Sequence, residues 1–519
     1  MNQLFLSLHR KSRDQKHKRL LQLLRPTSEM RTLNVPASGT RVGLSERLEP
    51  NRQADMILLF FLTVAAAGLR FLHLGARSLS LDEGYSVFLA RTAAPVFRMN
   101  IWHGEFNMVL YYSLLRLWTQ LGTSELVIRS LSVLFAAATV PVVYFLGRRL
   151  FGRGTALIAS LLLAIHPFHL ILAQQARSYA LLIFLVSMSS LFFLRLVQNP
   201  SWINCAAYAV LSAAAVYSHF FAALVILAQW LSLLLLMRRP LPWKELLTTG
   251  VVLIAMLVPV AVFLLHASPR NVGWVDRLSW QQVLDVLYSL TLSKARCLAY
   301  LALWTAGLWR AYQMRDDEAW PYRFIVMWLF VPPTITLIAS FVQPLLVSRY
   351  LGVCLPAGVL LAASGLLQVA RWSRPAAGAV LLLILFYSGS AIRFYDRHPE
   401  FEQDWRGASD YLLSRVQAGD EVVLDGYVRI TFDYYRARST VKVPPFVMVE
   451  SAASPLPKPA PLNVWCLGGV QQGSEISDPA ASNIAVQVFQ TAYGESYCAR
   501  PPQPKTGIVR VWQFVRCGD

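Results

Sequence analysis

Charged residues are scarce in this chain of 519 residues. Asp, Glu, Lys and Arg together make up 15% of it, whereas hydrophobic residues make up 55%. A typical water-soluble protein carries about a quarter charged residues. The scarcity therefore excludes an ordinary soluble enzyme and predicts a membrane protein with several spanning helices.

Acidic residues are scarcer than basic ones, with 29 Asp and Glu against 48 Lys and Arg, which gives a net charge of +19. An excess of this kind is also typical of nucleic-acid binding. Here, however, the cations cluster in short segments between apolar runs, as they do where charge sets membrane topology. We therefore expect membrane lipids, and no nucleic acid, as partners of this chain.

Cysteine is rare as well. The chain has six, and none stands in a CxxC or Cys/His spacing that would form a zinc site. Three lie in or beside apolar segments, where we expect them to pack. The polar tail holds the others, which predict one disulfide if the tail lies outside the cytoplasm: Cys466, Cys498 and Cys517.

Residues 1–54 lack apolar periodicity and carry basic clusters, which predicts a disordered cytoplasmic tail. The segment also lacks the apolar core of a signal peptide. The chain shows no internal repeat of the kind that indicates a transporter built from inverted halves.

Long apolar runs fill residues 55–394, the predicted membrane domain. We expect about eleven crossings of roughly 30 Å of hydrocarbon, at 55–74, 126–146, 155–173, 178–194, 202–217, 221–237, 246–266, 298–309, 324–341, 350–369 and 376–392. The run at 108–121 would span only about 21 Å as a helix, so we expect it to lie in the interface, as does 83–91. This assignment keeps Arg148, Arg149 and Arg153 on the inner face. A long outer loop is expected at 267–296.

The tail at 395–519 loses the apolar runs and predicts a small soluble α/β domain. We expect helices at 405–416 and 430–436, strands at 421–425, 463–467 and 509–514, and a loop at 444–461 that is rich in Pro, Ala and Ser. An odd number of crossings places this domain on the outer face of the plasma membrane. The predicted fold class is thus an all-α polytopic membrane protein with interfacial helices and a C-terminal soluble α/β domain.

Two adjacent acids, Asp82 and Glu83, follow the first apolar run. Adjacent carboxylates at a membrane surface must stay hydrated, paired or metal-bound, so the pair is a candidate catalytic centre. The alternative is that Asp82 only caps a short helix and stabilises it by its negative charge near the positive N-terminal end of the helix dipole.

The predicted topology brings further polar residues to the same face. Carboxylates can deprotonate a hydroxyl or hold a metal, and Arg with Tyr suits a lipid phosphate. As alternatives, lone arginines can reach lipid headgroups, and His219 can be a packed residue. The set comprises His103, Glu105, Asn107, Arg177, Tyr179, His219, Lys294, Arg296, Arg349 and Tyr350.

Seven segments in this order resemble the bacterial branch of the GT-C glycosyltransferases, the relatives of protein O-mannosyltransferases and of the lipid A aminoarabinose transferase. They are LDEGY at 81–85, LYYSLL at 110–115, SELVIRSLS at 124–132, GRRLFG at 147–152, HPFH with QARSY at 166–179, YSHFF at 217–221 and SRYL at 348–351. The resemblance covers about residues 54–392. It implies two interfacial helices after the first span, a polyprenyl-phosphate sugar donor and transfer at the outer face.

The resemblance also implies roles for single residues. Asp82 matches the essential first-loop acid, and Glu105 lies where some members place a second carboxylate that can bind a metal. Arg177 and Arg349, with Tyr350, fall where the donor phosphate is held. The chain departs from the family after His103, where many members read HPP, and metal dependence stays open.

These observations predict an integral-membrane glycosyltransferase that uses a polyprenyl-phosphate-linked hexose or pentose and a lipid, glycan or protein acceptor. Asp82 would act as base, Glu83 would orient it or a metal, and a single displacement would invert the sugar. The alternatives are a lipid-linked glycan ligase or polymerase, and a transporter or flippase.

Overall fold

A computed structural model describes residues 52–235, 241–266, 278–315, 319–397, 403–424, 426–440, 447–450, 463–469, 497–500 and 509–517. Nearly all of the predicted basic tail lies outside these residues. Its last residues begin the first described helix, α2. The chain divides into two compact units at residue 53, and the elements below belong to the second unit, apart from the start of α2.

Seven helices among the described residues are long and apolar enough to cross a membrane. A bent pair, α7 (Arg153–Ala164) and α8 (Pro167–Ala173), raises the number to eight if it forms one span. The bend of 57° falls at Pro167, which cannot donate a helical hydrogen bond. The seven are α2 (Arg52–Phe71), α6 (Glu125–Phe151), α9 (Tyr179–Gln198), α12 (Trp243–His266), α15 (Trp320–Ala339), η4 with α16 (Ser348–Trp372) and α17 (Arg374–Arg397).

Three further apolar helices fall where crossings are predicted: α10 (Trp202–Ser218), α11 (Ala222–Leu234) and α14 (Lys294–Tyr312). Helices thus form at all eleven predicted places, but a count of about eleven crossings is not established. The long outer loop predicted at 267–296 is wrong in part. Helix α13 (Trp280–Thr291) forms inside it, begins at a Ser279 N-cap, and is followed directly by α14.

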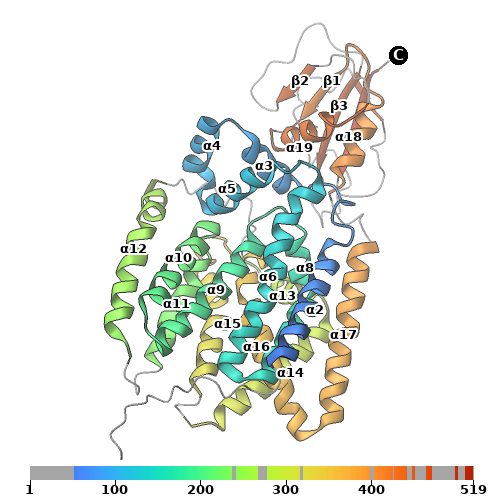
Figure 1. The fold of residues 1–519 in the computed structure, drawn as a ribbon. Coiled ribbons are helices and arrows are strands. Elements are labelled where there is room, and N and C mark those ends of the chain that lie inside the picture. Colours follow the sequence, from blue (N-terminus) through green and yellow to red (C-terminus); the bar gives the residue numbers. More distant parts are fainter. Residues whose placement is uncertain are drawn as a thin grey trace, which may run out of the picture. The chain divides into compact units, whose positions relative to one another are not determined.

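The centre of the membrane domain is formed by α6, α9 and α16, whose residues are mostly buried, whereas α2, α12 and α17 are largely exposed. Glycine allows the closest approach, between α14 and α16. A Cβ added at Gly365 would lie 1.8 Å from the Leu303 carbonyl oxygen. Figure 1 shows how these helices run beside one another.

The predicted helix at 83–91 is present as α3 (Leu81–Arg91), and the one at 108–121 as α5 (Val109–Trp118). Between them lie α4 (Ala94–Asn100), a π-helical turn, η1 (Ile101–Glu105), and a 3₁₀ turn, η2 (Phe106–Met108). Helix α3 packs against α4 and α5, and Figure 1 shows the three short blue helices together.

The C-terminal segment forms a small mixed sheet with two helices, as predicted. The order is α18 (Trp405–Leu413), β1 (Glu421–Leu424), α19 (Gly426–Arg436), β2 (Val447–Glu450), β3 (Asn463–Gly469), β4 (Tyr497–Ala499) and β5 (Val509–Arg516). The strands are arranged β2-β1-β3-β5-β4. β1 runs parallel to β2 and β3, and β5 runs antiparallel to β3 and β4.

One prediction for this segment is wrong. Strand β2 lies inside the predicted loop at 444–461, where the short apolar run 447–449 pairs with β1 although Pro and Ala surround it. A disulfide joins Cys498 and Cys517, with 5.2 Å between the Cα atoms, and Cys466 is buried in β3.

The predicted topology can be tested where α6 meets α7, because three arginines cluster there and two of them bind the buried Asp55. We expect this basic cluster to stay on the cytoplasmic side. Alkaline phosphatase fused after Gly152 should therefore be inactive in cells, and the same enzyme fused after Asp519 should be active. The opposite pattern would place Asp82 on the inner face.

Candidate active site

The start of helix α3 is fixed by its own side chains. The Ser80 hydroxyl accepts a hydrogen bond from the Glu83 amide, and the Glu83 carboxylate accepts one from the Ser80 amide. This reciprocal capping box satisfies two amides that a helix start leaves without partners. Asp82 lies between the two capping residues, so its backbone position is set by the cap.

Glu83 is buried and is held by Arg129. The Arg129 guanidinium donates to both carboxylate oxygens, at 2.7 and 2.8 Å, and the Ala176 amide donates to one of them at 2.8 Å. Burial alone would raise the pKa of Glu83, but the Arg129 charge and the hydrogen bonds outweigh it and hold the pKa below its usual value. All these contacts tie Glu83 into the protein interior.

Arg129 also binds the chain that leads into α3. It donates to the carbonyl oxygens of Leu74 and Arg77, at 3.1 and 2.9 Å, and to that of Ser78, at 2.8 Å. One side chain of α6 therefore fixes the end of the first span, the loop after it and the first turn of α3.

The Asp82 carboxylate behaves differently from that of Glu83. Its side chain is 47% exposed, and one oxygen lies 3.6 Å from a guanidinium nitrogen of Arg349, which is 33% exposed. An exposed ion pair of this kind is weak and leaves the carboxylate open to another group. Asp82 is thus the acid of the predicted pair that is accessible.

Arg177 joins the same group from the turn between α8 and α9. Its Nη1 donates to the Asp82 carbonyl oxygen at 3.4 Å, the Ser86 hydroxyl at 3.4 Å and the Tyr112 hydroxyl at 3.3 Å. Its Nε atom is buried and has no partner in the part of the chain that the structure describes. The guanidinium therefore retains a donor for a further acceptor.

Glu105 is the second carboxylate near Asp82. The hydroxyls of Tyr85 and Tyr112 bond to it, the latter at 3.1 Å. Burial raises the pKa of Glu105, and the Arg177 charge opposes the rise only in part. A group of three His, Cys, Asp or Glu side chains fit to hold a metal does not occur among the described residues, so metal binding by Glu105 stays a prediction.

Aromatic rings line the other side of the arginines. The Tyr350 ring lies 6.3 Å from that of Tyr179 and 4.6 Å from that of His219, measured between centroids. Burial and the neighbouring Arg177 and Arg349 lower the pKa of His219 to about 3. His219 is therefore neutral, and it accepts a hydrogen bond from the Phe221 amide.

The remaining predicted residues lie apart from this group or support it. The Asn107 side chain accepts a hydrogen bond from the Phe220 amide at 2.8 Å and so fixes the turn that carries His219. His103 is exposed and bonds to the Met99 carbonyl, and Lys294 is exposed at the start of α14. Arg296 is buried, where it donates to the Thr291 carbonyl and neighbours Tyr300 and His166.

The structure thus brings together seven of the predicted residues: Asp82, Glu105, Arg177, Tyr179, His219, Arg349 and Tyr350. Four residues that contact the predicted ones were missed from the sequence: Tyr85, Ser86, Tyr112 and Arg129. Arg129 stands in SELVIRSLS and Tyr112 in LYYSLL, so both motifs contained a signal. Tyr85 ends LDEGY, whereas Ser86 lies just outside that motif.

Known proteins provide an independent comparison. Residues 108–266 match the family model described as dolichyl-phosphate-mannose-protein mannosyltransferase. A comparison with curated protein sequences finds no match. The fold, with its long helices and small C-terminal sheet, is similar to that of solved structures of ArnT and of an archaeal oligosaccharyltransferase, and the resemblance predicted from the sequence motifs is confirmed.

Among solved structures, the chain is similar to ArnT from Cupriavidus metallidurans in the apo state, with a TM-score of 0.58, 14% identity, and coverage of 89% of this chain and 98% of that one. The same enzyme bound to undecaprenyl phosphate gives a TM-score of 0.56. The oligosaccharyltransferase of Archaeoglobus fulgidus gives 0.50 at 14% identity, over 74% of this chain. This chain spans 64% of that archaeal enzyme, which is less than two thirds of its length.

The Glu83 and Arg129 pair allows a stability test. Arg129→Met leaves a buried carboxylate without its cation, which typically costs about 3 to 5 kcal/mol, and thermal unfolding of the purified protein in detergent measures the loss. The exposed pair of Arg429 and Asp433 is the control, because Asp433→Asn should cost less than about 1 kcal/mol.

The same pair predicts a pH dependence. Because the pKa of Glu83 is lowered by folding, its contribution is complete above the unfolded value, about 4.3, and is lost as the pH falls through the folded value. Wild-type protein should therefore lose stability below about pH 4 more steeply than Glu83→Gln. Equal slopes would show that the pair contributes little.

Proposed function

We propose that this protein is an integral-membrane glycosyltransferase, which transfers a hexose or pentose from a polyprenyl-phosphate donor to an acceptor hydroxyl. The observation that carries the proposal is the accessible Asp82 carboxylate beside two arginines, Arg177 and Arg349. The family match and the fold shared with ArnT, a protein solved with undecaprenyl phosphate, support it.

The residues present fit a lipid phosphate. Arg177 has a buried Nε without a partner among the described residues, and Arg349 forms a partly exposed ion pair with Asp82. Guanidinium groups bind phosphate through paired hydrogen bonds. Tyr350 packs beside Arg349 and limits its movement, with the guanidinium carbon 6.0 Å from the ring centroid.

The chemistry assigned to these residues is a single displacement. The acceptor oxygen attacks the anomeric carbon and forms the new glycosidic bond, and its proton passes to Asp82. The bond from the anomeric carbon to the phosphate oxygen breaks, and polyprenyl phosphate leaves. Arg177 and Arg349 stabilise the charge that grows on this phosphate, and the sugar is inverted.

Glu83 has a positioning role in this proposal. Its carboxylate is fully used by Arg129, Ser80 and Ala176, so it orients the first turn of α3 and with it Asp82. Glu105, whose pKa is raised by burial, is the candidate for holding a divalent metal or a proton beside the acceptor.

We place the site and the C-terminal domain on the outer face of the plasma membrane, where cell-envelope lipids, glycans and proteins are available as acceptors. The deciding experiment incubates membranes with radiolabelled polyprenyl-phosphate sugars and measures which fraction takes up label. Release of polyprenyl monophosphate supports the proposal. Label transferred only from a diphosphate-linked glycan would instead identify a ligase or polymerase.

Asp82→Asn removes the base and keeps the shape of the side chain. Turnover should fall by about 10² to 10⁴, because this is the contribution of a general base. Glu83→Gln should slow turnover less. Asp410→Asn, which changes an exposed acid on α18, is the matched control and should leave turnover unchanged. Turnover of Asp82→Asn near the wild-type value would rule out Asp82 as the base.

Arg177→Lys and Arg349→Lys test the phosphate contacts. Lys keeps the charge but cannot reproduce the forked geometry, and a charge-assisted bond contributes about 1.5 to 3 kcal/mol. Each variant should therefore reduce donor use by about tenfold or more, as measured by kcat/KM for the donor. The double variant should lose less than the product of the two if both side chains bind one phosphate. Independent effects would mean that the two arginines act at different groups.

A further inference from the structure

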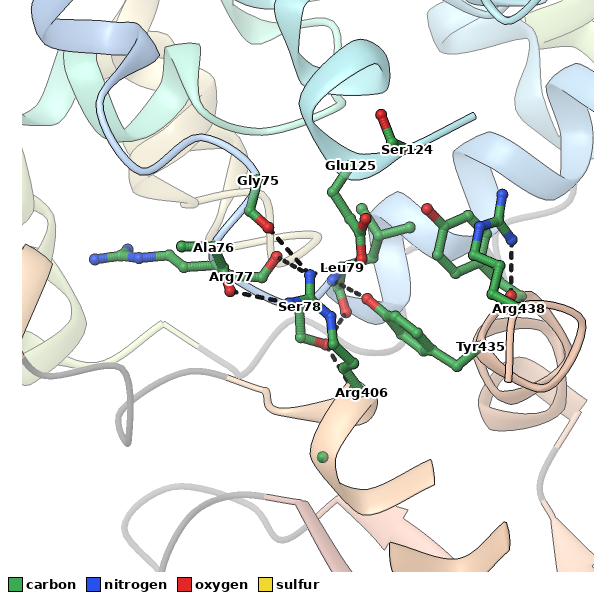
Figure 2. Close-up of polar contacts among 12 residues, drawn as sticks. Gly75, Ala76, Arg77, Ser78, Leu79, Ser124, Glu125, Arg406, Tyr435 and Arg438 are labelled. Atoms are coloured by element: carbon green, nitrogen blue, oxygen red, sulfur yellow. Dashed lines mark hydrogen bonds and ion pairs between the residues drawn. The ribbon is translucent and has the colours of Figure 1, made fainter. Parts of the chain in front are cut away.

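The C-terminal domain reaches the first turn of the helix that carries Asp82. The Leu79 amide donates to the Tyr435 hydroxyl at 2.7 Å, and the Leu81 amide donates to the Gln403 side-chain oxygen at 3.0 Å. Gln403 lies two residues before the start of α18, and Tyr435 lies on α19. Figure 2 shows Tyr435 pointing at Leu79.

The contact of Gln403 adds to the cap of α3, and that of Tyr435 fixes the residue before the N-cap. The first amides of a helix lack partners within the helix. In α3 the amides of Ser80 and Glu83 are satisfied locally by the capping box, whereas the amide of Leu81, its first residue, is satisfied by Gln403. The start of the helix therefore depends on a residue more than three hundred positions later in the chain.

Arg406 fixes the segment just before α3. It donates to the carbonyl oxygens of Gly75, Ala76 and Arg77 at 3.2 to 3.3 Å, and it forms an ion pair of 2.7 Å with Glu125 at the start of α6. Figure 2 shows the Arg406 side chain among these carbonyl groups. Its backbone amide also donates to the Ser78 hydroxyl.

Between α3 and α19, close packing occurs at Gly84. Helix α19 packs on α3, and a Cβ added at Gly84 would lie 2.2 Å from the Thr431 hydroxyl oxygen and 3.1 Å from the Thr431 Cβ. Thr431 is fully buried, and its hydroxyl has no hydrogen-bond partner among the described residues. Gly84 follows Asp82 by two residues, so α19 sets the distance at which the acid-bearing turn is held.

We propose that the C-terminal domain positions the catalytic carboxylate, with Gln403 and Tyr435 as positioning residues for Asp82. The inference rests on the proposed function of Asp82. Arg129 holds the first turn of α3 from the membrane domain, and α19 holds it from the soluble domain. A displacement of about 1 Å at a reacting group can slow an enzyme about a hundredfold, so this contact controls turnover.

The first test compares Gly84→Ala with the double variant that also carries Thr431→Ala. Alanine favours a helix over glycine, so any loss in Gly84→Ala comes from the collision with Thr431. We expect kcat to fall at least tenfold, with the donor KM changed less than threefold. Thr431→Ala alone should stay near the wild type. The double variant should recover part of kcat, because Thr431→Ala removes the oxygen at 2.2 Å and leaves the Cβ at 3.1 Å.

Two outcomes of this test overturn the proposal. In the first, Gly84→Ala has the wild-type kcat per folded molecule, even if less of the protein folds. The contact would then serve only the stability of the fold. The other is a loss in Gly84→Ala that Thr431→Ala does not reverse.

Tyr435→Phe provides a second measurement that needs no activity and adds no bulk. Hydrogen exchange of residues 78–85 should become several-fold faster, because the Leu79 amide loses its acceptor, and kcat should fall. Tyr411→Phe, on α18 beside Arg415, is the matched control. If the wild type transfers sugar from none of the donors, the proposed function fails. If Tyr435→Phe leaves the hydrogen exchange of residues 78–85 unchanged, the positioning inference is overturned instead.

Discussion

The ion pair between Glu83 and Arg129 is the interaction on which the site depends. It lies almost wholly out of water, where a lone charge of either sign would be strongly destabilising. Both charges are used fully, since Glu83 also binds two amides and Arg129 three carbonyl groups. The pair thus connects α6, the turn before α9 and the first turn of α3 around one buried contact.

The same contact explains why two adjacent acids have different roles. Glu83 turns inward and is fixed by Arg129. Asp82, the residue before it, is thereby held outward beside Arg349. A sequence with two acids in succession gives no indication of which acid is buried. The distinction comes from Arg129, which lies 46 residues away on another helix.

Much of the fold could be predicted from the sequence, because apolar runs and short charged segments mark each membrane helix. The errors arise where this signal is weak. Helix α13 is amphipathic and lies in a segment read as a loop, and β2 is only four residues long among prolines and alanines. The number of crossings could not be predicted for a physical reason as well. Helices α10 and α11 are shorter than a typical span, and α14 is too polar for one.

The site could be predicted in part, because polar residues at helix ends on one face must meet if the helices pack. That argument holds for Arg177 and Arg349, which reach Asp82 from the turn before α9 and from η4 (Ser348–Cys354). The argument fails for Arg296 and Lys294. The sequence shows that both residues lie at the end of a helix, but it does not show in which direction their side chains point. Arg296 turns toward Tyr300, and Lys294 faces outward.

The cap that Gln403 supplies to Leu81 spans 322 positions of the sequence. A ribosome adds residues one at a time, so α3 is synthesised and inserted long before its last cap exists. During this interval the acid-bearing turn has only the contacts of the membrane domain. The protein therefore matures in an order set by its sequence. The membrane helices form first, and the turn that carries Asp82 is aligned last, once the C-terminal domain has folded against it.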